Sequence, residues 1–197
     1  MKAFLDLFVA RRCIGCGIAN VDVCVHCRRE LVPIVRRDLP GIGQCRAAGA
    51  YDGWLRSALL RYKSGDASVV AGLRNVLSSV MDTTAPTFVI PVPSSTTKVV
   101  ERGYDTIALL TKDMHTSRVP LLRLMREPDD QVGLTALQRR DNVHQAMRCS
   151  RAITGSVLLV DDVVTTGATL VEAARALRVA GASQINAICV CAAQIKG

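Results

Sequence analysis

Residues 157–170 read VLLVDDVVTTGATL, and this segment constrains the fold more than any other part of the chain. Its first four residues are branched and apolar, the pattern of a strand buried in a parallel sheet. Two acidic residues, a turn rich in Thr and Gly, and an amphipathic helix follow. The apolar stripe of that helix consists of Leu170, Ala173, Ala174 and Leu177. A strand that leads through a short turn into a helix predicts an α/β fold.

The residues between this strand and this helix have the chemistry of a site for a phosphorylated sugar. Backbone N–H groups at the start of a helix, together with the positive end of its dipole, hold a phosphate. The hydroxyls of Thr165, Thr166 and Thr169 add donors. The carboxylates of Asp161 and Asp162 can accept hydrogen bonds from ribose hydroxyls, or face a Mg²⁺ ion that those hydroxyls also bind.

Three other structures share parts of this pattern. A Walker B strand also ends in Asp, but the chain contains no G-x-x-x-x-G-K-[ST] sequence. A phospho-receiver domain can open with a similar strand, but the 35 residues that follow Asp162 are too few for one. A strand, turn and helix with solvated acids and no ligand remains the alternative.

Four of the eight cysteines form two C-x-x-C pairs near the N-terminus. Paired knuckles let backbone N–H groups support the thiolates, while the loop between them closes a tetrahedral site of four sulfur atoms. Gly15 and Gly17 supply the tight turn that the first knuckle needs. The ligands predicted for a structural Zn²⁺ ion are Cys13, Cys16, Cys24 and Cys27. A redox or disordered cysteine cluster is the alternative, and His26 could replace a Cys ligand.

Composition limits the compartment and the partners. Apolar residues make up 49% of the 197 residues, and no apolar run approaches the roughly 18 residues of a transmembrane helix. The first twelve residues, MKAFLDLFVARR, are interrupted by Asp6 and lack a small-residue cleavage site, which favours an amphipathic helix over a signal peptide. We therefore expect a cytoplasmic protein without membrane insertion or disulfides. The net charge of +8 suits phosphate-rich partners.

The chain divides into two predicted units. Residues 1–45 contain the N-terminal helix, the cysteine module and a linker over 31–45 that is rich in Pro and Gly. Residues 46–197 form the main domain. Its expected strands are 47–51, 87–91, 157–160 and 185–192, and its expected helices are 54–63, 69–81, 101–114 and 170–179. Residues 126–151 show little periodicity and predict a long loop. Alternating strands and helices predict a parallel sheet with helices on both faces.

A second polar constellation follows the strand expected at 87–91. Two prolines fix the shape of the loop PVPSS at 91–95, and its N–H groups and hydroxyls could cradle a diphosphate together with two cations. These predicted residues are Ser94, Ser95, Lys98 and Arg102. Lys63 could reach the same cleft from the preceding helix. In the long loop, Gln131, Arg139 and Arg140 could form a lid that excludes water. Rigid or solvated surface loops are the alternative for both segments.

Taken together, these residues resemble the ComF family of competence-associated, phosphoribosyltransferase-like proteins. The resemblance rests on the two Cys pairs, YDG at 51–53, YK at 62–63, PVP at 91–93, ERGY at 101–104, Gln131, RRDN at 139–142, and residues 157–170. One departure lies at residues 105–106, where Asp-Thr replaces the usual Asn-Gln and adds a negative charge near the expected diphosphate site.

The resemblance implies a type I phosphoribosyltransferase fold behind an N-terminal zinc finger, with phosphoribosyl pyrophosphate (PRPP) and Mg²⁺ as ligands. The implied PRPP-binding residues are Ser94, Ser95, Asp161, Asp162, Val164, Thr165, Thr166, Gly167, Ala168 and Thr169. The implied catalytic residues are Asp161, Asp162, Lys98 and Arg102. In members active in natural transformation, the resemblance also implies handling of incoming single-stranded DNA.

Two functions are therefore expected from the sequence and the resemblance. The first is transfer of phosphoribose from PRPP to an unknown acceptor, which the intact acidic pair favours. The second is PRPP sensing or single-stranded DNA handling without turnover, beside DNA-uptake proteins, which the cysteine module and the basic surface favour. Only 4% of the residues are aromatic, so no stacking platform for single strands is visible.

Overall fold

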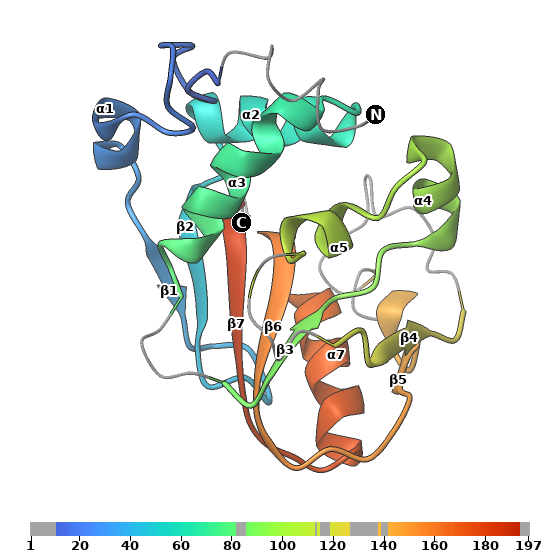
Figure 1. Cartoon of the computed structure of the whole chain (residues 1–197). Coiled ribbons are helices and arrows are strands. Elements are labelled where there is room, and N and C mark those ends of the chain that lie inside the picture. Colours follow the sequence, from blue (N-terminus) through green and yellow to red (C-terminus); the bar gives the residue numbers. More distant parts are fainter. Residues whose placement is uncertain are drawn as a thin grey trace.

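A five-stranded sheet forms the centre of the computed structural model, which describes residues 11–81, 86–112, 114, 119–126, 138 and 142–193. The strand order is β1-β2-β7-β6-β3 (Figure 1). The strands are β1 (Ile34–Arg36), β2 (Cys45–Ala50), β3 (Phe88–Pro91), β6 (Gly155–Val164) and β7 (Ala182–Ala192). All neighbours pair in parallel except β1, which runs antiparallel to β2. The expected mixed α/β fold with a mostly parallel sheet is confirmed.

Successive residues of β6 enter two separate cores. Leu158 and Val160 belong to a core that includes α2 (Gly53–Lys63), the 3-10 turn η1 (Ala67–Val69) and α3 (Val70–Ser78). Val157 and Leu159 belong to a core built with α7 (Ala168–Val179). This alternation is typical of a strand that is covered on both faces. It explains why residues 157–160 are uniformly apolar.

The expected helix at 101–114 is wrong. The chain instead forms α4 (Thr96–Arg102) and α5 (Thr106–Leu110). Gly103 has a φ of 78°, and its N–H donates to the carbonyl of Val99, which ends α4 in a left-handed turn. Asp105 then begins α5 by accepting a hydrogen bond from the N–H of Ala108 at 3.0 Å. A glycine at a helix end, followed by a capping acid, accounts for the break.

Two stretches expected to lack regular structure contain strands. The predicted linker at 31–45 includes β1, and the predicted loop at 126–151 includes β5 (Met147–Cys149), which pairs antiparallel with β4 (Leu122–Leu124). Strands of three residues are too short to show a periodic pattern. The division of the chain after residue 45 stays a prediction, although β1 before it pairs with β2.

The expected N-terminal helix at 1–12 falls mostly on residues 1–10, which lie outside the described residues. Arg12 forms an isolated antiparallel bridge with Ala19. The short helix α1 (Val25–Arg29) follows within the cysteine module. In the part of the chain that the structure describes, no helix is both long enough and apolar enough to cross a membrane.

A buried acid fastens the β4–β5 ribbon to α7. Glu172 is 4% exposed, and its carboxylate accepts a hydrogen bond from the N–H of Met147 at 3.0 Å. The guanidinium of Arg175 donates to Glu172 at 2.8 Å and to the carbonyl of Met147 at 3.0 Å. Burial raises the pKa of Glu172, but the hydrogen bonds from Arg175 and Met147 outweigh it and lower that pKa. Both backbone groups of Met147 are thereby tied to α7.

Candidate functional site

A cavity of about 460 Å³ opens at the carboxyl ends of β3 and β6. Ligands of open α/β sheets bind at this edge. The cavity is bounded by the β3–α4 loop, α4, the β6–α7 turn, the end of α2 and the β4–β5 ribbon. The predicted site residues that line it are Ser94, Ser95, Lys98, Arg102, Asp161, Asp162, Val164, Thr165, Gly167, Ala168 and Thr169. The fold therefore brings both polar constellations of the sequence to one place.

Two of the predicted groups lie elsewhere or cannot be placed. Thr166 is not among the residues that line this cavity, and its hydroxyl accepts a hydrogen bond from the N–H of Ala168 at 3.3 Å. It therefore caps the start of α7. The predicted lid residues, Gln131, Arg139 and Arg140, lie outside the described residues, so the lid stays a prediction.

The acidic pair lies within β6, because the strand continues to Val164 instead of ending at Val160. The two carboxylates have different surroundings. Asp162 faces the end of α2, where its Oδ2 is 2.6 Å from Nζ of Lys63. Asp161 is opposite Cys189 of β7 in the parallel ladder, and its Oδ1 accepts a hydrogen bond from the N–H of Asp162 at 2.8 Å. Among the residues that the structure describes, Asp162 is thus paired with a cation and Asp161 is not.

Electrostatics separates the two acids further. Burial raises the pKa of Asp161 to about 8, and the negative charge of Asp162 adds to this effect. Burial lowers the pKa of Lys63, but the charge of Asp162 outweighs it and raises that pKa. The pair therefore combines an ion-paired carboxylate with a carboxyl that keeps its proton at neutral pH. Such a split provides one hydrogen-bond acceptor and one group that can give or take a proton.

We expect the stability of the ligand-free protein to fall with rising pH in the range where Asp161 ionises. The pKa of Asp in an unfolded chain is about 4, whereas the pKa of Asp161 in the folded protein is about 8. Between these two pH values the folded state binds more protons than the unfolded state. The stabilisation that the proton of Asp161 contributes is therefore complete below about pH 4 and is lost as the pH rises through about 8. Asp161→Asn should remove it. Urea unfolding of both proteins at about pH 5.5 and about pH 8.5 measures the difference, which should change by about 1 kcal/mol or more. Parallel pH profiles would contradict the raised pKa.

Two tyrosines fix the position of Lys63. The hydroxyl of Tyr62, a fully buried residue, donates to the carbonyl of Thr106 at 2.5 Å. The hydroxyl of Tyr104 donates to the carbonyl of Tyr62. These bonds tie the end of α2 to α5, so Lys63 is held beside the acidic pair. Tyr51, which the site prediction did not include, also lines the cavity.

The side of the cavity formed by α4 carries two cations on one helix face. Lys98 and Arg102 lie four residues apart on α4, so they project in the same direction. The loop before them is held by its own hydroxyls: Ser95 accepts from the N–H of Lys98 at 3.5 Å, and Ser94 donates to Asp105 at 2.9 Å. Asp105, the departure from the family pattern, therefore joins the β3–α4 loop to the cap of α5.

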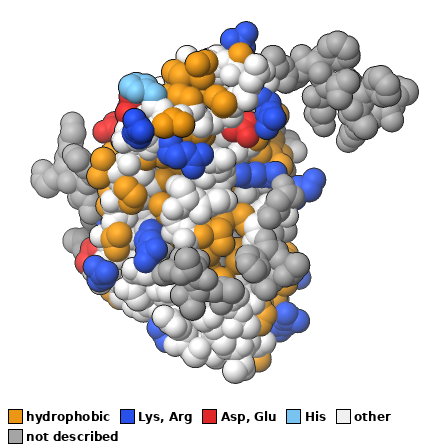
Figure 2. Space-filling model, turned by 60° about the vertical axis from the view of Figure 1, so that its left-hand side comes forward, with side chains coloured by type: hydrophobic (Ala, Val, Ile, Leu, Met, Phe, Trp, Pro, Cys, Tyr) orange, Lys and Arg blue, Asp and Glu red, His pale blue; other side chains and the backbone are white. Residues whose placement is uncertain are grey.

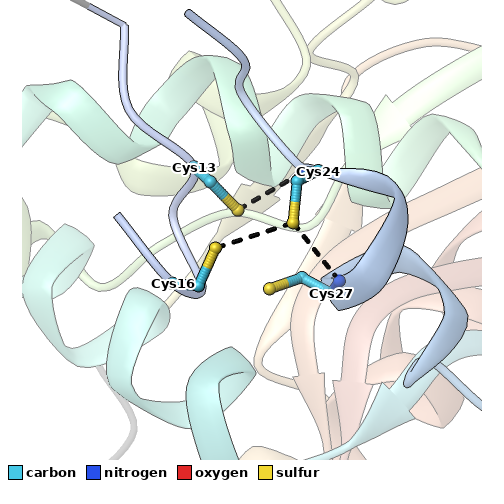
Figure 3. A group of neighbouring side chains, drawn as sticks. All are labelled: Cys13, Cys16, Cys24 and Cys27. Atoms are coloured by element: carbon cyan, nitrogen blue, oxygen red, sulfur yellow. Dashed lines mark hydrogen bonds between the residues drawn. The ribbon is translucent and has the colours of Figure 1, made fainter. Parts of the chain in front are cut away.

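Four sulfur atoms converge at the N-terminal module (Figure 3). The Sγ atoms of Cys13, Cys16, Cys24 and Cys27 all lie within 4.8 Å of one another, and those of Cys16 and Cys24 are 3.6 Å apart. A tetrahedral Zn²⁺ ion, bonded to each thiolate at about 2.3 Å, places the sulfurs about 3.8 Å apart. The cluster therefore fits a metal ion such as zinc.

Backbone donors support the thiols of this cluster. The N–H of Cys24 donates to Sγ of Cys13 at 3.3 Å, and the N–H of Cys27 donates to Sγ of Cys24 at 3.4 Å. Burial raises the pKa of Cys13, but the N–H groups of Cys16, Cys24 and Gly15 outweigh it and lower that pKa to about 6. Burial raises the pKa of Cys27. Thiolates held by N–H groups are ready metal ligands.

The residues beside the cysteines fit the predicted set of four cysteine ligands, and the two glycines of the first knuckle have different roles. Gly17 has a φ of 79°, as a tight turn requires. Gly15 is needed for space, because a Cβ there would lie 2.6 Å from Sγ of Cys27. His26 does not take the place of a cysteine: its side chain is 82% exposed, and its Nε2 lies 3.1 Å from Glu30.

The cysteine module packs on the helical layer above the sheet. Cys13, Ile14 and Cys27 belong to the same core as Leu55 of α2 and Leu73 of α3. The approach is close, because a Cβ at Gly72 would lie 2.5 Å from the side chain of Ile14. The cysteine cluster and Lys63 therefore share α2 as a common support.

Comparisons with known proteins agree with this site. Residues 133–197 match the model of the phosphoribosyl transferase domain family. The chain is 30% identical over 146 residues to Competence protein ComFC of Bacillus subtilis (strain 168), an alignment that spans 72% of this chain and 60% of that protein. It is 34% identical over 114 residues to Competence protein F of Haemophilus influenzae, which spans 51% of this chain and 48% of that protein. The chain thus covers about half to three fifths of these relatives.

The family-model match over residues 133–197 includes the strand, the acidic pair and the turn that carry the site, and the sequence ahead of it holds the four converging sulfur atoms. The chain belongs to the ComF competence protein family, with a phosphoribosyltransferase domain and an N-terminal four-cysteine cluster.

Proposed function

We propose that the chain binds PRPP with Mg²⁺ in the cavity at the ends of β3 and β6, and transfers its phosphoribosyl group to an acceptor. The observation that carries this proposal is the convergence of three elements on one cavity: the acidic pair, the turn into α7, and the cationic face of α4. Each element suits a different part of PRPP. The two cysteine pairs are proposed to hold a structural Zn²⁺ ion, and the cytoplasm is the proposed compartment.

The three parts of PRPP divide between these elements. The 5′-phosphate is assigned to the turn and the first residues of α7, where N–H groups lack partners within the helix. The ribose hydroxyls are assigned to Asp161 and Asp162. The diphosphate is assigned to the β3–α4 loop and the two cations of α4. The residues assigned to the 5′-phosphate are Val164, Thr165, Gly167, Ala168 and Thr169. Those assigned to the diphosphate are Ser94, Ser95, Lys98 and Arg102.

Transfer breaks the bond between C1 of ribose and the diphosphate oxygen, and the acceptor forms a new bond to C1. The electron pair of the broken bond leaves with pyrophosphate, so Lys98 and Arg102 stabilise developing negative charge. Mg²⁺, when bound with PRPP, neutralises further charge on the diphosphate. The ribose becomes transiently cationic, and the negatively charged carboxylate of Asp162 belongs to the part of the cavity that is assigned to the ribose. The acceptor loses its proton to solvent or to the ionised carboxylate of Asp162.

We expect Mg²⁺-dependent release of pyrophosphate from PRPP in the presence of an acceptor. The assay compares nucleobases, ammonia, simple amines and single-stranded oligonucleotides. Asp161→Asn/Asp162→Asn should reduce release by at least about 100-fold, because both ribose contacts lose their acid chemistry. Glu101→Gln, an exposed residue of α4, is the matched control and should keep full release. Equal rates in the double variant would overturn the assignment.

A second function is favoured by the surroundings of the cysteine module and by the names of the two relatives, both competence proteins. Four exposed arginines lie in and beside this module: Arg11, Arg12, Arg28 and Arg29. Lys and Arg side chains are spread over the face shown in Figure 2 instead of forming one patch. In this alternative, the chain senses PRPP or handles single-stranded DNA without turnover.

The DNA affinity of the chain in this alternative should fall steeply between low and physiological salt. An affinity that does not change with salt would exclude binding through phosphate contacts.

A further inference from the structure

Arg36, the last residue of β1, reaches the turn between β6 and α7. Its Nη1 donates a hydrogen bond of 2.6 Å to the carbonyl of Thr165, a residue 129 positions further along the chain. Two further hydrogen bonds, from Nε and Nη2 of Arg36 to the carboxylate of Asp38 at 3.0 and 2.5 Å, hold the guanidinium in place. The Arg36 side chain is 18% exposed. This arginine is therefore fixed at both sides of its guanidinium.

The same stretch of chain supports the turn by packing. Leu39 is buried, and a Cβ at Gly167 would lie only 2.4 Å from its Cδ2. Gly167 also has a φ of 83°, which side chains other than that of glycine rarely allow. Arg178 of α7 holds the stretch from below by donating to the carbonyl of Gly41 at 3.2 Å. The turn thus rests on the connection between β1 and β2.

We infer that Arg36 is a positioning residue for the phosphate-binding turn, acting through the carbonyl of Thr165. The inference rests on the proposed function of this cavity. Arg36 is not among the residues that line the cavity, and Asp38 balances its charge, so it does not act as a phosphate ligand itself. It holds one peptide plane of the turn next to a glycine that could otherwise adopt several conformations. A turn ordered before binding loses less entropy when a ligand arrives.

The test compares Arg36→Met with Arg37→Met. Both variants remove one positive charge and keep a long apolar stem, but Arg37 is exposed and no hydrogen bond of its side chain is seen in the described residues. The probes are ribose 5-phosphate, which needs the turn, and pyrophosphate, which needs the β3–α4 side. We expect Arg36→Met to lose about tenfold in ribose 5-phosphate affinity and to keep its pyrophosphate affinity, since a hydrogen bond from a charged donor contributes on that order. Arg37→Met should match the wild type with both probes.

A general loss of structure would weaken the binding of ribose 5-phosphate and of pyrophosphate equally, and that result would overturn the inference. Equal ribose 5-phosphate affinity in all three proteins would overturn it as well. Arg36→Lys, which keeps the charge but loses the fork that joins Asp38 to Thr165, serves if the Met variant does not fold.

Amide hydrogen exchange of the ligand-free proteins separates this inference from the proposed function. Peptides that cover residues 164–169 should exchange at least about tenfold faster in Arg36→Met than in Arg37→Met, because local opening becomes easier. Unchanged exchange contradicts the positioning role. If the wild type binds neither probe, the proposed function fails, while the exchange rates still decide whether Arg36 orders the turn.

Discussion

Removal of the proposed Zn²⁺ ion from the four-cysteine cluster will lower the midpoint of thermal unfolding by about 10 °C or more. Cys13 and Cys27 are buried in the core that contains α2 and α3, so four unbridged thiols would leave a gap in the support of this helical layer. Structural zinc sites contribute several kcal/mol to folding, and each kcal/mol corresponds to about 2–4 °C in a domain of this size. Circular dichroism with and without a chelator measures the shift, and added Zn²⁺ should restore it.

A matched pair of variants distinguishes the metal from general cysteine chemistry. Cys24→Ser removes one proposed ligand, whereas Cys149→Ser changes a cysteine of similar burial that lies on β5, outside the cluster. Only the first should lower the midpoint by several degrees and bring the metal content below one ion per chain. Equal midpoints for these two variants, with equal metal content, would exclude a structural metal in this cluster.

Lys63→Met will destabilise the protein by about 3 kcal/mol and weaken the proposed PRPP binding, because it leaves Asp162 largely buried without its cation. The side chains of Lys63 and Asp162 are 30% and 14% exposed, and their charged atoms are 2.6 Å apart. Breaking such a pair costs more than the pair itself contributes. The double variant Lys63→Met/Asp162→Asn should therefore recover about half of the lost unfolding free energy. Urea unfolding at neutral pH measures the free energy of unfolding of the wild type, the single variant and the double variant.

The control lies on the same helix. Arg61 pairs with Asp66 at 2.8 Å, but these side chains are 49% and 34% exposed, so Arg61→Met should cost less than about 1 kcal/mol. A cost for Lys63→Met no larger than that of Arg61→Met would show that water, and not Lys63, compensates the charge of Asp162.

The parts of the site that the sequence predicted are those carried by local patterns. Residues 157–170 combine a strand, a turn and a helix in one contiguous segment, so the order of these elements can be read from the segment itself. The loop at 91–95 could be placed beside them because the carboxyl ends of parallel strands meet at one edge of a sheet. The two cysteine pairs are close enough in sequence to meet in a single module.

The parts that escaped prediction depend on tertiary partners. The contact between Arg36 and Thr165 joins residues far apart in sequence, and no periodic pattern reports such a pairing. Strand β1 consists of three residues, and it is a strand only because β2 lies beside it. Gly103 stands inside the segment expected to be one helix, where a single glycine can be tolerated, and only its φ of 78° reveals the break.

The short outer strands of the sheet have a consequence for association between copies of the chain. Strands β6 and β7 have 10 and 11 residues with long apolar runs, and such segments form intermolecular sheets when their edges are free. They lie inside the sheet, between neighbours on both sides. The outer edges of the sheet belong to β1, with three residues, and to β3, with four residues that end in Pro91, which has no N–H to donate. Folded molecules thus offer each other little backbone to pair with, and edge-to-edge aggregation requires prior unfolding.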